Sequence, residues 1–385
     1  MKLVYVTADN PHEWNSSEWR CAVPARAINR SGLAHATLVD LREWLSGTPV
    51  AMAACRAADI LIIQRNLVGP VLAAILHWKA QGKTIIAEFD DAYDQMPDSN
   101  PAYAYWHKGW VRHPDGGYET MSPTPIEQFA WGLKLCHAAT MPSQRLAEDW
   151  GHLLPTYHLP NALDPAIYRT DERPTRDTGE LSATVEPGKI RIGWGGSMSH
   201  LQSFTESGVL TALQRVCRAR PDVEIVIHGN DGRLLDALKV SHEQKVLRPW
   251  VPYNEWPAQL RGLDIGLAPL SGSYDERRSW IKALEYLAVG VPWIASEGSV
   301  YAGLRPFGTL VENSAYAWER AILTHIDTLG ERRLLARANR AQAARYTSDA
   351  MVPDMLDIYR RVHERLQTPA VAANVAAQRA ERMAP

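Results

Sequence analysis

The chain has 385 residues, of which 46% are hydrophobic and 22% are charged, and its formal net charge is −2. This length and composition are typical of a globular protein with two α/β domains of ordinary size. No apolar run approaches the roughly 18 residues needed to span a bilayer, so we expect no stable membrane insertion. A charge near zero also excludes a general electrostatic attraction to nucleic acid or anionic lipid.

The N-terminal sequence MKLVYVTADNP contains only a short apolar stretch, which we interpret as a first strand and not as a secretory signal. The cysteines have no C-x-x-C spacing, so the sequence predicts neither a zinc site nor a disulfide framework. A cytoplasmic location fits this cysteine usage. The four cysteines are Cys21, Cys55, Cys136 and Cys217.

Short apolar runs alternate with longer amphipathic stretches along the chain, which is the pattern of βαβ units and parallel sheets. The strands expected in the first half are residues 2–7, 36–39, 59–64, 84–89, 138–141 and 156–159. Those expected in the second half are residues 190–194, 223–228, 245–247, 265–268, 293–296 and 309–311. The predicted class is α/β with two doubly wound sheets.

A polar stretch without periodicity, residues 170–188, predicts a linker between two domains. Two doubly wound sheets would face each other across a cleft and bind ligands at the carboxyl ends of their strands. The expected organisation is an N-terminal domain over residues 1–168, a linker over 169–188, a C-terminal domain over 189–345, a C-terminal helix over 346–368 and a flexible tail over 369–385.

The first candidate site is the segment KIRIGWGGSMSH, where Gly195, Gly196 and Ser197 end a strand before a helical stretch. A glycine-rich loop lets backbone N–H groups and a helix N-terminus approach a phosphate. The third glycine of a dinucleotide fingerprint would fall on Met198, and no P-loop lysine follows, which disfavours a nicotinamide enzyme. His200 either donates to a phosphate or is an exposed loop residue, and a tight turn without a ligand is the alternative for the loop.

The second candidate site lies in GLDIGLAPLSGSYDERRSWIKALEYLAVGVPWIAS, where Lys282 and Glu285 are three residues apart on one helix face. The ammonium suits the charge of a diphosphate, and the carboxylate suits the two hydroxyl protons of a ribose diol. A surface ion pair of little energetic value is the alternative for such a spacing. Arg248, which follows another predicted strand, is either a further cation for the diphosphate or a solvated surface residue.

The order of these motifs, GWGGS, VEIVIHGN, DIGLAPL and SWIKALEYLAVGVPWIAS, resembles the donor-binding domain of GT-B-fold glycosyltransferases of glycosyltransferase family four. In the first half, the EFDDAYDQMP segment and LPNALDP occur in the order seen in phage and bacterial members. The resemblance implies a GT-B fold of two Rossmann-like domains facing a cleft, over roughly residues 1–345.

The resemblance also implies roles for single residues. Glu285 matches the glutamate that binds the donor ribose, and Lys282 matches the basic residue of a K-x-x-E branch, with a diphosphate role. The first glutamate of the family's pair would fall on Arg277, with Glu276 one step away. The segment from Trp250 to Tyr253 resembles the part of the family that holds the nucleobase.

The EFDDAYD segment places Glu88, Asp90, Asp91 and Asp94 after a predicted strand of the first domain. We favour acceptor binding or proton abstraction by Asp90 and Asp91 over metal binding, since the spacing is not Asp-x-Asp. A simple capping or turn role is the alternative. The region from Asp9 to Trp19 occupies the place where the family has a glycine-rich loop.

The predicted function is therefore transfer of a sugar from a nucleoside diphosphate sugar to a hydroxyl acceptor, with retention implied by the resemblance, by a metal-independent enzyme without a cofactor. The acceptor is left open between a glycan, a lipid-linked sugar, a small molecule and a modified phage DNA base. Two alternatives are a nucleotide-sugar epimerase of the same architecture and a nucleotide-sugar-binding protein without turnover.

Overall fold

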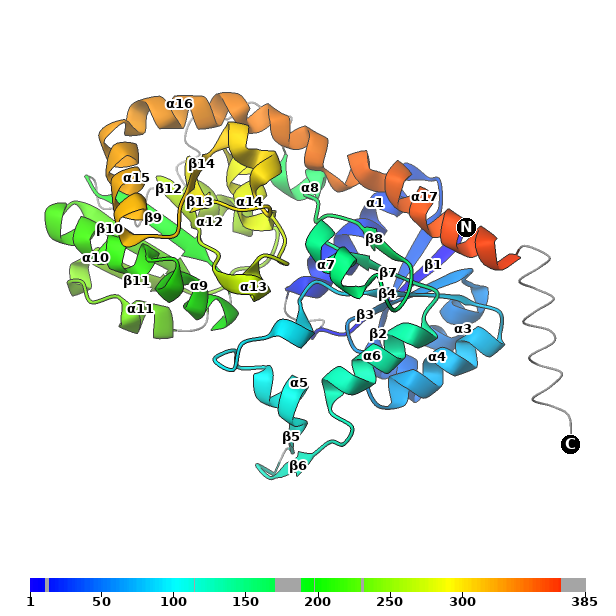
Figure 1. Ribbon diagram of the computed structural model, residues 1–385. Coiled ribbons are helices and arrows are strands. Elements are labelled where there is room, and N and C mark those ends of the chain that lie inside the picture. Colours follow the sequence, from blue (N-terminus) through cyan, green and yellow to red (C-terminus); the bar gives the residue numbers. More distant parts are fainter. Residues whose placement is uncertain (11–13, 114, 170–187, 197, 230–231, 368–385) are drawn as a thin grey trace, which may run out of the picture. The chain divides into compact units, whose positions relative to one another are not determined.

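The computed structural model describes residues 1–10, 14–113, 115–169, 188–196, 198–229 and 232–367. The described chain forms two compact units (Figure 1). The first unit contains residues 1–90, 107–160 and the helix that starts at Ser348, and the second contains residues 91–106 and 161–347. The linker predicted over 169–188 and the tail predicted over 369–385 fall almost entirely outside the described residues, and the predicted domain boundaries stay a prediction.

The first unit is built on a six-stranded parallel sheet with the order β2-β1-β3-β4-β7-β8. Because its central strands are buried on both faces, they read as continuous apolar runs such as ILII in β3. Its strands are β1 (Lys2–Thr7), β2 (His35–Asp40), β3 (Ile60–Gln64), β4 (Thr84–Glu88), β7 (Ala138–Met141) and β8 (Thr156–His158).

The second unit has its own six-stranded parallel sheet, with the order β11-β10-β9-β12-β13-β14. The strand order reverses between β9 and β12, which is the point where doubly wound sheets bind ligands. The strands are β9 (Ile190–Gly195), β10 (Val223–His228), β11 (Lys245–Arg248), β12 (Ile265–Ala268), β13 (Trp293–Ser296) and β14 (Thr309–Val311). All twelve strands expected from the sequence are confirmed, with ends that differ by at most two residues.

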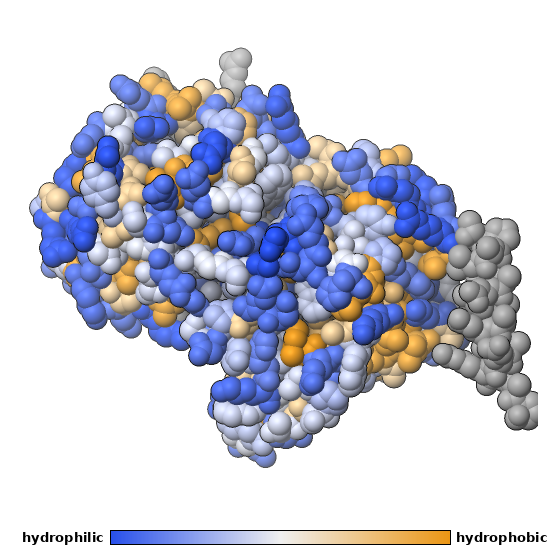
Figure 2. All heavy atoms as spheres, viewed as in Figure 1, coloured by the Kyte–Doolittle hydropathy of each residue, from blue (hydrophilic) through white to orange (hydrophobic). Residues whose placement is uncertain are grey.

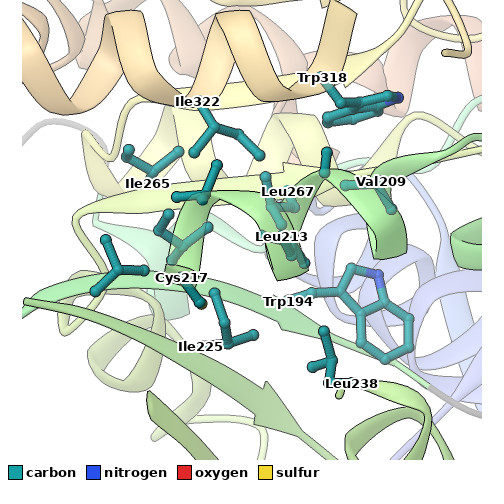
Figure 3. Packing of buried hydrophobic residues seen from close by; sticks show 14 of the residues in the cluster. Trp194, Val209, Leu213, Cys217, Ile225, Leu238, Ile265, Leu267, Trp318 and Ile322 are labelled. Atoms are coloured by element: carbon teal, nitrogen blue, oxygen red, sulfur yellow. The ribbon is translucent and has the colours of Figure 1, made fainter. Parts of the chain in front are cut away.

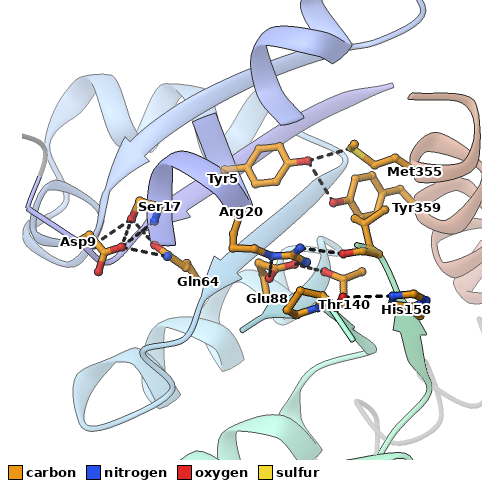
Figure 4. Close-up of polar contacts among 12 residues, drawn as sticks. Tyr5, Asp9, Ser17, Arg20, Gln64, Glu88, Thr140, His158, Met355 and Tyr359 are labelled. Carbon is orange, nitrogen blue, oxygen red and sulfur yellow. Dashed lines mark hydrogen bonds and ion pairs between the residues drawn. The ribbon is translucent and has the colours of Figure 1, made fainter. Parts of the chain in front are cut away.

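Helices cover the first sheet, and the last helix of the chain belongs to this unit. The Tyr5 hydroxyl of β1 lies 3.1 Å from the Tyr359 hydroxyl and 3.7 Å from the Met355 sulfur (Figure 4). The sequence predicted this final helix but not its partner. The helical elements are η1 (Glu18–Ala22), α1 (Val23–Ser31), α2 (Leu41–Ser46), α3 (Pro49–Ala57), α4 (Pro70–Ala80), α6 (Pro125–Leu135), α7 (Gln144–Trp150) and α17 (Ser348–Gln367).

A hairpin that the sequence analysis did not predict interrupts the first unit between β4 and β7. Its antiparallel strands, β5 (Trp110–Arg112) and β6 (Tyr118–Thr120), follow the short helix α5 (Tyr103–Lys108). The residues of both strands are almost all exposed and form no buried apolar run, so the signal that identifies the other short strands is missing here.

In the second unit, α10 (Val209–Ala219) and α15 (Ala315–Asp327) pack on the same face of the sheet (Figure 3). Val209, Leu213 and Val216 form one buried stripe of α10 at helical spacing and contact Ile225, while Trp318 comes from α15. The other helices are α8 (Pro165–Tyr168), α9 (Leu201–Glu206), α11 (Arg233–Ala237), α12 (Trp256–Arg261), α13 (Gly272–Asp275), α14 (Ile281–Val289) and α16 (Leu329–Asn339).

The helix α14 lies directly on β9 and β12, where the strand order reverses. The Tyr286 hydroxyl donates to the backbone oxygens of Leu267 at 3.1 Å and Gly193 at 3.3 Å. A Cβ atom at Gly266 would collide with the Tyr286 ring, so this glycine lets the helix approach the strand closely. The close packing places the first turn of α14 beside the carboxyl end of β9.

Candidate functional site

The glycine loop at the end of β9 lies against aromatic side chains of the second unit. A Cβ atom at Gly195 would collide with the Trp256 ring, and one at Gly196 would collide with the Trp194 ring and approach the Lys282 Nζ to 3.0 Å. Only glycine fits at both positions because rings fill the space that a side chain would need. Ser197, the third predicted loop residue, lies outside the described residues.

Lys282 stands in the first turn of α14 and connects the helix to this loop. Its half-buried Nζ donates to the backbone oxygen of Gly195 at 2.7 Å and lies 5.1 Å from the centre of the Trp194 ring. Burial lowers the pKa of Lys282 to about 8, with Glu285 opposing the shift and Arg278 adding to it. The ammonium therefore carries its charge at neutral pH beside the glycine loop.

Glu285 follows one turn later on the same helix face and is buried. Its Oε1 accepts hydrogen bonds from the Tyr168 hydroxyl at 2.6 Å and from the Trp256 Nε1 at 2.7 Å. Among the described residues none donates to the second oxygen, Oε2. Burial raises the pKa of Glu285 to about 7, although Tyr168, Lys282 and Trp256 favour its ionised form. Oε2 is therefore an acceptor left for a further hydrogen-bond donor.

Arg278 is a cation of this site that the sequence analysis did not single out. Its Nε lies 2.8 Å from Asp275 Oδ1, and its Nη1 lies 2.7 Å from the Nε2 of His200. Its Nη2 donates to the Ser199 hydroxyl at 3.1 Å. These contacts hold the guanidinium next to the residues that follow the glycine loop. The sequence signal for this cation is the pair Arg277–Arg278 ahead of the K-x-x-E motif. The pair alone does not tell which of the two arginines faces the loop.

His200 is buried in the structure, so its interpretation as an exposed loop residue is wrong. Burial lowers the pKa of His200 well below its usual value, and the nearby Arg278 and Lys282 add to the shift. Because Nε2 faces the Arg278 donor, a neutral ring would carry its proton on Nδ1, which is buried and has no partner among the described residues. Two cations and one unsatisfied donor therefore surround the end of β9.

Arg277 and Glu276, the two positions expected from the resemblance to hold the first glutamate of the pair, have different surroundings from Glu285. Arg277 is buried and its Nη1 donates to the Ser273 backbone oxygen, whereas the Glu276 side chain is 64% exposed. Neither the arginine nor the glutamate is placed like Glu285. The structure thus brings Lys282, Glu285 and His200 together and adds Arg278 to them.

Arg248 ends β11, one strand beyond β10 in the same sheet. Its half-buried side chain makes no ion pair or hydrogen bond with the described residues, while its backbone oxygen accepts from the Gly229 N–H at 2.9 Å. His228, at the end of β10, is buried against Trp256, and burial together with the charge of Arg248 lowers the pKa of His228 to about 4. The Trp250 ring also contacts Trp256, with 5.0 Å between centroids. The diphosphate role of Arg248 stays a prediction.

In the first unit, the carboxyl end of β4 carries a buried ion pair. Glu88 accepts from the Arg20 Nε at 2.6 Å and the Arg20 Nη2 at 2.9 Å, and from the Thr140 hydroxyl (Figure 4). Burial raises the pKa of Glu88 to about 7, against the opposing effect of Arg20. Arg20 and Thr140 therefore hold the Glu88 carboxylate in place. Asp90, two residues later, differs from it. The Oδ1 of Asp90 is buried and has no hydrogen-bond partner among the described residues.

Asp91 is half-buried and belongs to the second unit, whereas Asp90 belongs to the first. The catalytic roles of both residues stay predictions.

The segment that begins at Asp9 forms a polar cluster with Gln64 (Figure 4). Asp9 Oδ2 accepts from the Ser17 N–H at 2.7 Å and from the Ser17 hydroxyl at 2.8 Å. The Gln64 side-chain oxygen also accepts from that hydroxyl, at 2.6 Å. Residues 11–13 of this segment lie outside the described residues.

A separate cavity of about 420 Å³ opens beside α15 in the second unit. It shares no lining residue with the site around Lys282. Its lining includes Glu312, Arg320, His325 and Arg332.

No protein-family model and no curated protein matches the chain. Solved structures nevertheless resemble it over almost its whole length. The sucrose-phosphate synthase of Thermosynechococcus elongatus has a TM-score of 0.61 at 10% identity, covering 94% of this chain and 98% of that one. A protein assigned as a UDP-N-acetylglucosamine 2-epimerase from Listeria monocytogenes has a TM-score of 0.51 at 13% identity, covering 94% and 96%. MnaA from S. aureus, solved with UDP, has a TM-score of 0.50 at 9% identity, covering 94% and 97%.

These neighbours share one architecture of two Rossmann-like domains. The chain has a GT-B-like fold. The predicted fold class is confirmed, while membership of glycosyltransferase family four and of its phage and bacterial branch stays a prediction. This fold is shared by a protein named as a sucrose-phosphate synthase and by one assigned as an epimerase, so it does not decide between glycosyl transfer and epimerisation.

Within the described residues, no helix is both long and apolar enough to cross a membrane. The same residues contain no group of three or more His, Cys, Asp or Glu side chains arranged to hold a metal ion. All four cysteines are buried and free in the structure.

Proposed function

We propose that the chain is a glycosyltransferase that uses a nucleoside diphosphate sugar as donor and a hydroxyl group as acceptor. The observation that carries the proposal is the N-terminal half of α14, where Lys282 contacts the glycine loop and Glu285 follows one turn later, at the point where the strand order reverses. A cation, a buried carboxylate with one uncommitted oxygen and a glycine loop are the groups that a nucleoside diphosphate needs.

Each group has a distinct task in this proposal. Glu285 Oε2 accepts hydrogen bonds from the ribose hydroxyls, while Oε1 stays fixed by Tyr168 and Trp256. Lys282 and Arg278 offset the charge of the diphosphate, and the His200 Nδ1–H adds a hydrogen bond. These groups are held in place before the ligand arrives, so little reorganisation is needed when charge develops on the leaving group.

In the transfer step, the acceptor oxygen forms a bond to the anomeric carbon of the donor sugar as the bond from that carbon to the diphosphate oxygen breaks. The nucleoside diphosphate leaves with the electron pair, and the acceptor hydroxyl gives up its proton. Asp90 or Asp91 is the proposed group that orients the acceptor or takes this proton. We propose retention of the anomeric configuration, on the resemblance to family four.

A nucleotide-sugar epimerase is the second candidate, because the similar structures include the protein assigned as a UDP-N-acetylglucosamine 2-epimerase. The deciding experiment incubates the protein with UDP- and GDP-sugars, first alone and then with a panel of hydroxyl acceptors, and follows the sugar by NMR. Transfer that requires an acceptor supports the proposal. A changed sugar configuration without any acceptor supports the epimerase, and binding without any reaction across the panel supports a binding protein without turnover.

A further inference from the structure

The β5–β6 hairpin of the first unit is closed at its base by a specific backbone contact. The Met121 N–H donates to the Gly109 oxygen at 2.7 Å, and Gly109 has a φ of 68°. A Cβ atom at Gly109 would collide with the Met121 backbone oxygen, so this closure requires glycine. At the other end, His113 N–H donates to the Gly117 oxygen at 2.8 Å. The hairpin is therefore a defined element.

One side of this hairpin gathers aromatic rings and cations. Side chains alternate along a strand, so Trp110 and Arg112 share a side, and the pairing of Arg112 with Tyr118 places Tyr118 there too. The Trp110 and Tyr118 rings are 6.5 Å apart and are 49% and 66% exposed. Lys108 Nζ lies 5.1 Å from the centre of the Trp110 ring. We call these four residues, Lys108, Trp110, Arg112 and Tyr118, the hairpin face.

The charge of the hairpin does not suit a polyanion. Its cations, Lys108 and Arg112, are balanced by Asp115 and Glu119 in the same segment. Nucleic acid binding depends on several cations that contact successive phosphates, which this balance does not provide.

The polarity of the surroundings does not suit a broad apolar partner either. In the view of Figure 2, the surface over the hairpin, at the bottom, is mostly pale and blue, with no wide hydrophobic area. The hairpin face itself combines two exposed rings with two cationic side chains, so a ligand with both an apolar surface and polar groups suits it. A sugar ring has both, because its C–H groups form a flat apolar side and its hydroxyls surround that side.

We propose that the hairpin face binds an oligosaccharide that is part of the acceptor; this inference rests on the proposed function. The sugar stacks on the exposed Trp110 and Tyr118 rings, which offer rigid contact area at a low cost in conformational entropy. The guanidinium of Arg112 has several N–H groups that donate to sugar hydroxyls. Lys108 supports the Trp110 ring through a cation–π contact. Of the acceptor classes, this selects a glycan or a glycan-bearing molecule.

The test measures binding of the fluorescently labelled full-length protein to an array of neutral and acidic oligosaccharides. The variants are Trp110→Ala and Tyr118→Ala, and the control is Trp131→Ala, which removes a 50% exposed tryptophan from α6 in the same unit. The wild type is expected to bind at least one class of oligosaccharide. Each hairpin variant is expected to weaken this binding by about tenfold or more, because it removes an aromatic anchor. The control variant is expected to leave the binding unchanged.

Absence of binding to every oligosaccharide, or binding that survives both hairpin substitutions, would overturn the inference. Competition by the oligonucleotide dT20 for a site that depends on Trp110 would also overturn it, in favour of nucleic acid. The melting temperature of each variant, with and without nucleoside diphosphates, is measured in parallel. Hairpin-dependent sugar binding without any stabilisation by these nucleotides would defeat the proposed function, and with it the acceptor role of the sugar, but would leave the sugar site itself standing. Stabilisation without sugar binding would defeat only this inference.

Discussion

Replacing Glu285 by Gln isolates the uncommitted carboxylate oxygen from the rest of the site. The glutamine oxygen can keep the hydrogen bonds from Tyr168 and Trp256, so the side chain stays in place with nearly the same volume. At the other position an amide N–H₂ replaces Oε2, and a group that accepted from a ribose hydroxyl now only donates. The change therefore removes one acceptor and one negative charge without opening a cavity.

The expected loss follows from the strength of hydrogen bonds to a charged acceptor. Such bonds contribute about 1.5–3 kcal/mol each, compared with about 0.5–1.5 kcal/mol for neutral ones. Glu285→Gln is therefore expected to weaken binding of a nucleoside and of its diphosphate alike, by about 10- to 100-fold. Isothermal titration calorimetry of both ligands measures this loss. Glu255→Gln, an exposed glutamate at the start of α12, is the control and is expected to change neither affinity.

The pH dependence of binding gives a second measurement on the same variant. Ribose hydroxyls favour ionised Glu285, whose pKa burial raises to about 7, so affinity is expected to rise as the pH increases through 7. Lys282, with a pKa lowered to about 8, loses its charge above that pH, so affinity for a diphosphate then falls. The wild type should bind a nucleoside diphosphate best between pH 7 and 8. Glu285→Gln should lose the rise on the acidic side, and an unchanged affinity and pH profile would refute the assignment.

Protein stability should follow pH with a definite sign. Because the pKa of Glu285 in the folded protein is raised from 4.5 to about 7, its contribution to stability is present below pH 4.5 and is lost as the pH rises through 7. Removing this titrating group should therefore flatten the decline in the free energy of unfolding between pH 4.5 and 7. Denaturant unfolding of the wild type and Glu285→Gln at several pH values checks this, and identical slopes would contradict the burial of a titrating carboxylate.

The remaining predictions concern the diphosphate, the acceptor and metal ions. Lys282→Ala should weaken binding of a nucleoside diphosphate by about tenfold or more but barely affect binding of the bare nucleoside. Calorimetry measures both affinities, with Lys239→Ala, at an exposed lysine, as the control. Equal losses for the two ligands would remove Lys282 from the diphosphate site. Asp90→Asn or Asp91→Asn should reduce the transfer rate by about 10² or more and leave donor affinity unchanged. Asp94→Asn, at an exposed aspartate, is the control and should leave the transfer rate unchanged. A change in donor affinity alone would contradict an acceptor role. Transfer activity should persist in EDTA, and its loss with recovery on adding Mg²⁺ or Mn²⁺ would show that a metal ion is required.

The sequence was sufficient to predict most of the fold, because buried parallel strands form continuous apolar runs that are easy to recognise. The runs 60–63 in β3 and 225–227 in β10 are examples, and both strands lie inside their sheets. The strands of the β5–β6 hairpin were missed because their residues are almost all exposed and form no apolar run. The packing of α17 in the first unit was also missed, since an amphipathic helix does not encode which surface it covers.

The candidate site was predictable where local spacing decides the geometry. Lys282 and Glu285 share a helix face because they are three residues apart, and the glycine loop follows directly from its strand. Tertiary contacts decide the rest. The choice of Arg278 over Arg277, the burial of His200 and the fixing of Glu285 by Tyr168 depend on residues far away in the chain, which no local pattern reveals.

The central claim is that the second unit binds a nucleoside diphosphate through Lys282 and Glu285 of α14. A thermal-unfolding screen with nucleosides, nucleoside diphosphates and nucleotide sugars tests it most directly, because a ligand that binds only the native state raises the melting temperature by mass action. The account predicts that at least one nucleoside diphosphate stabilises the wild type and that the double variant Lys282→Ala, Glu285→Gln, folded in the absence of ligand, is not stabilised. No stabilisation of the wild type by any of these ligands, or equal stabilisation of the double variant, would contradict it.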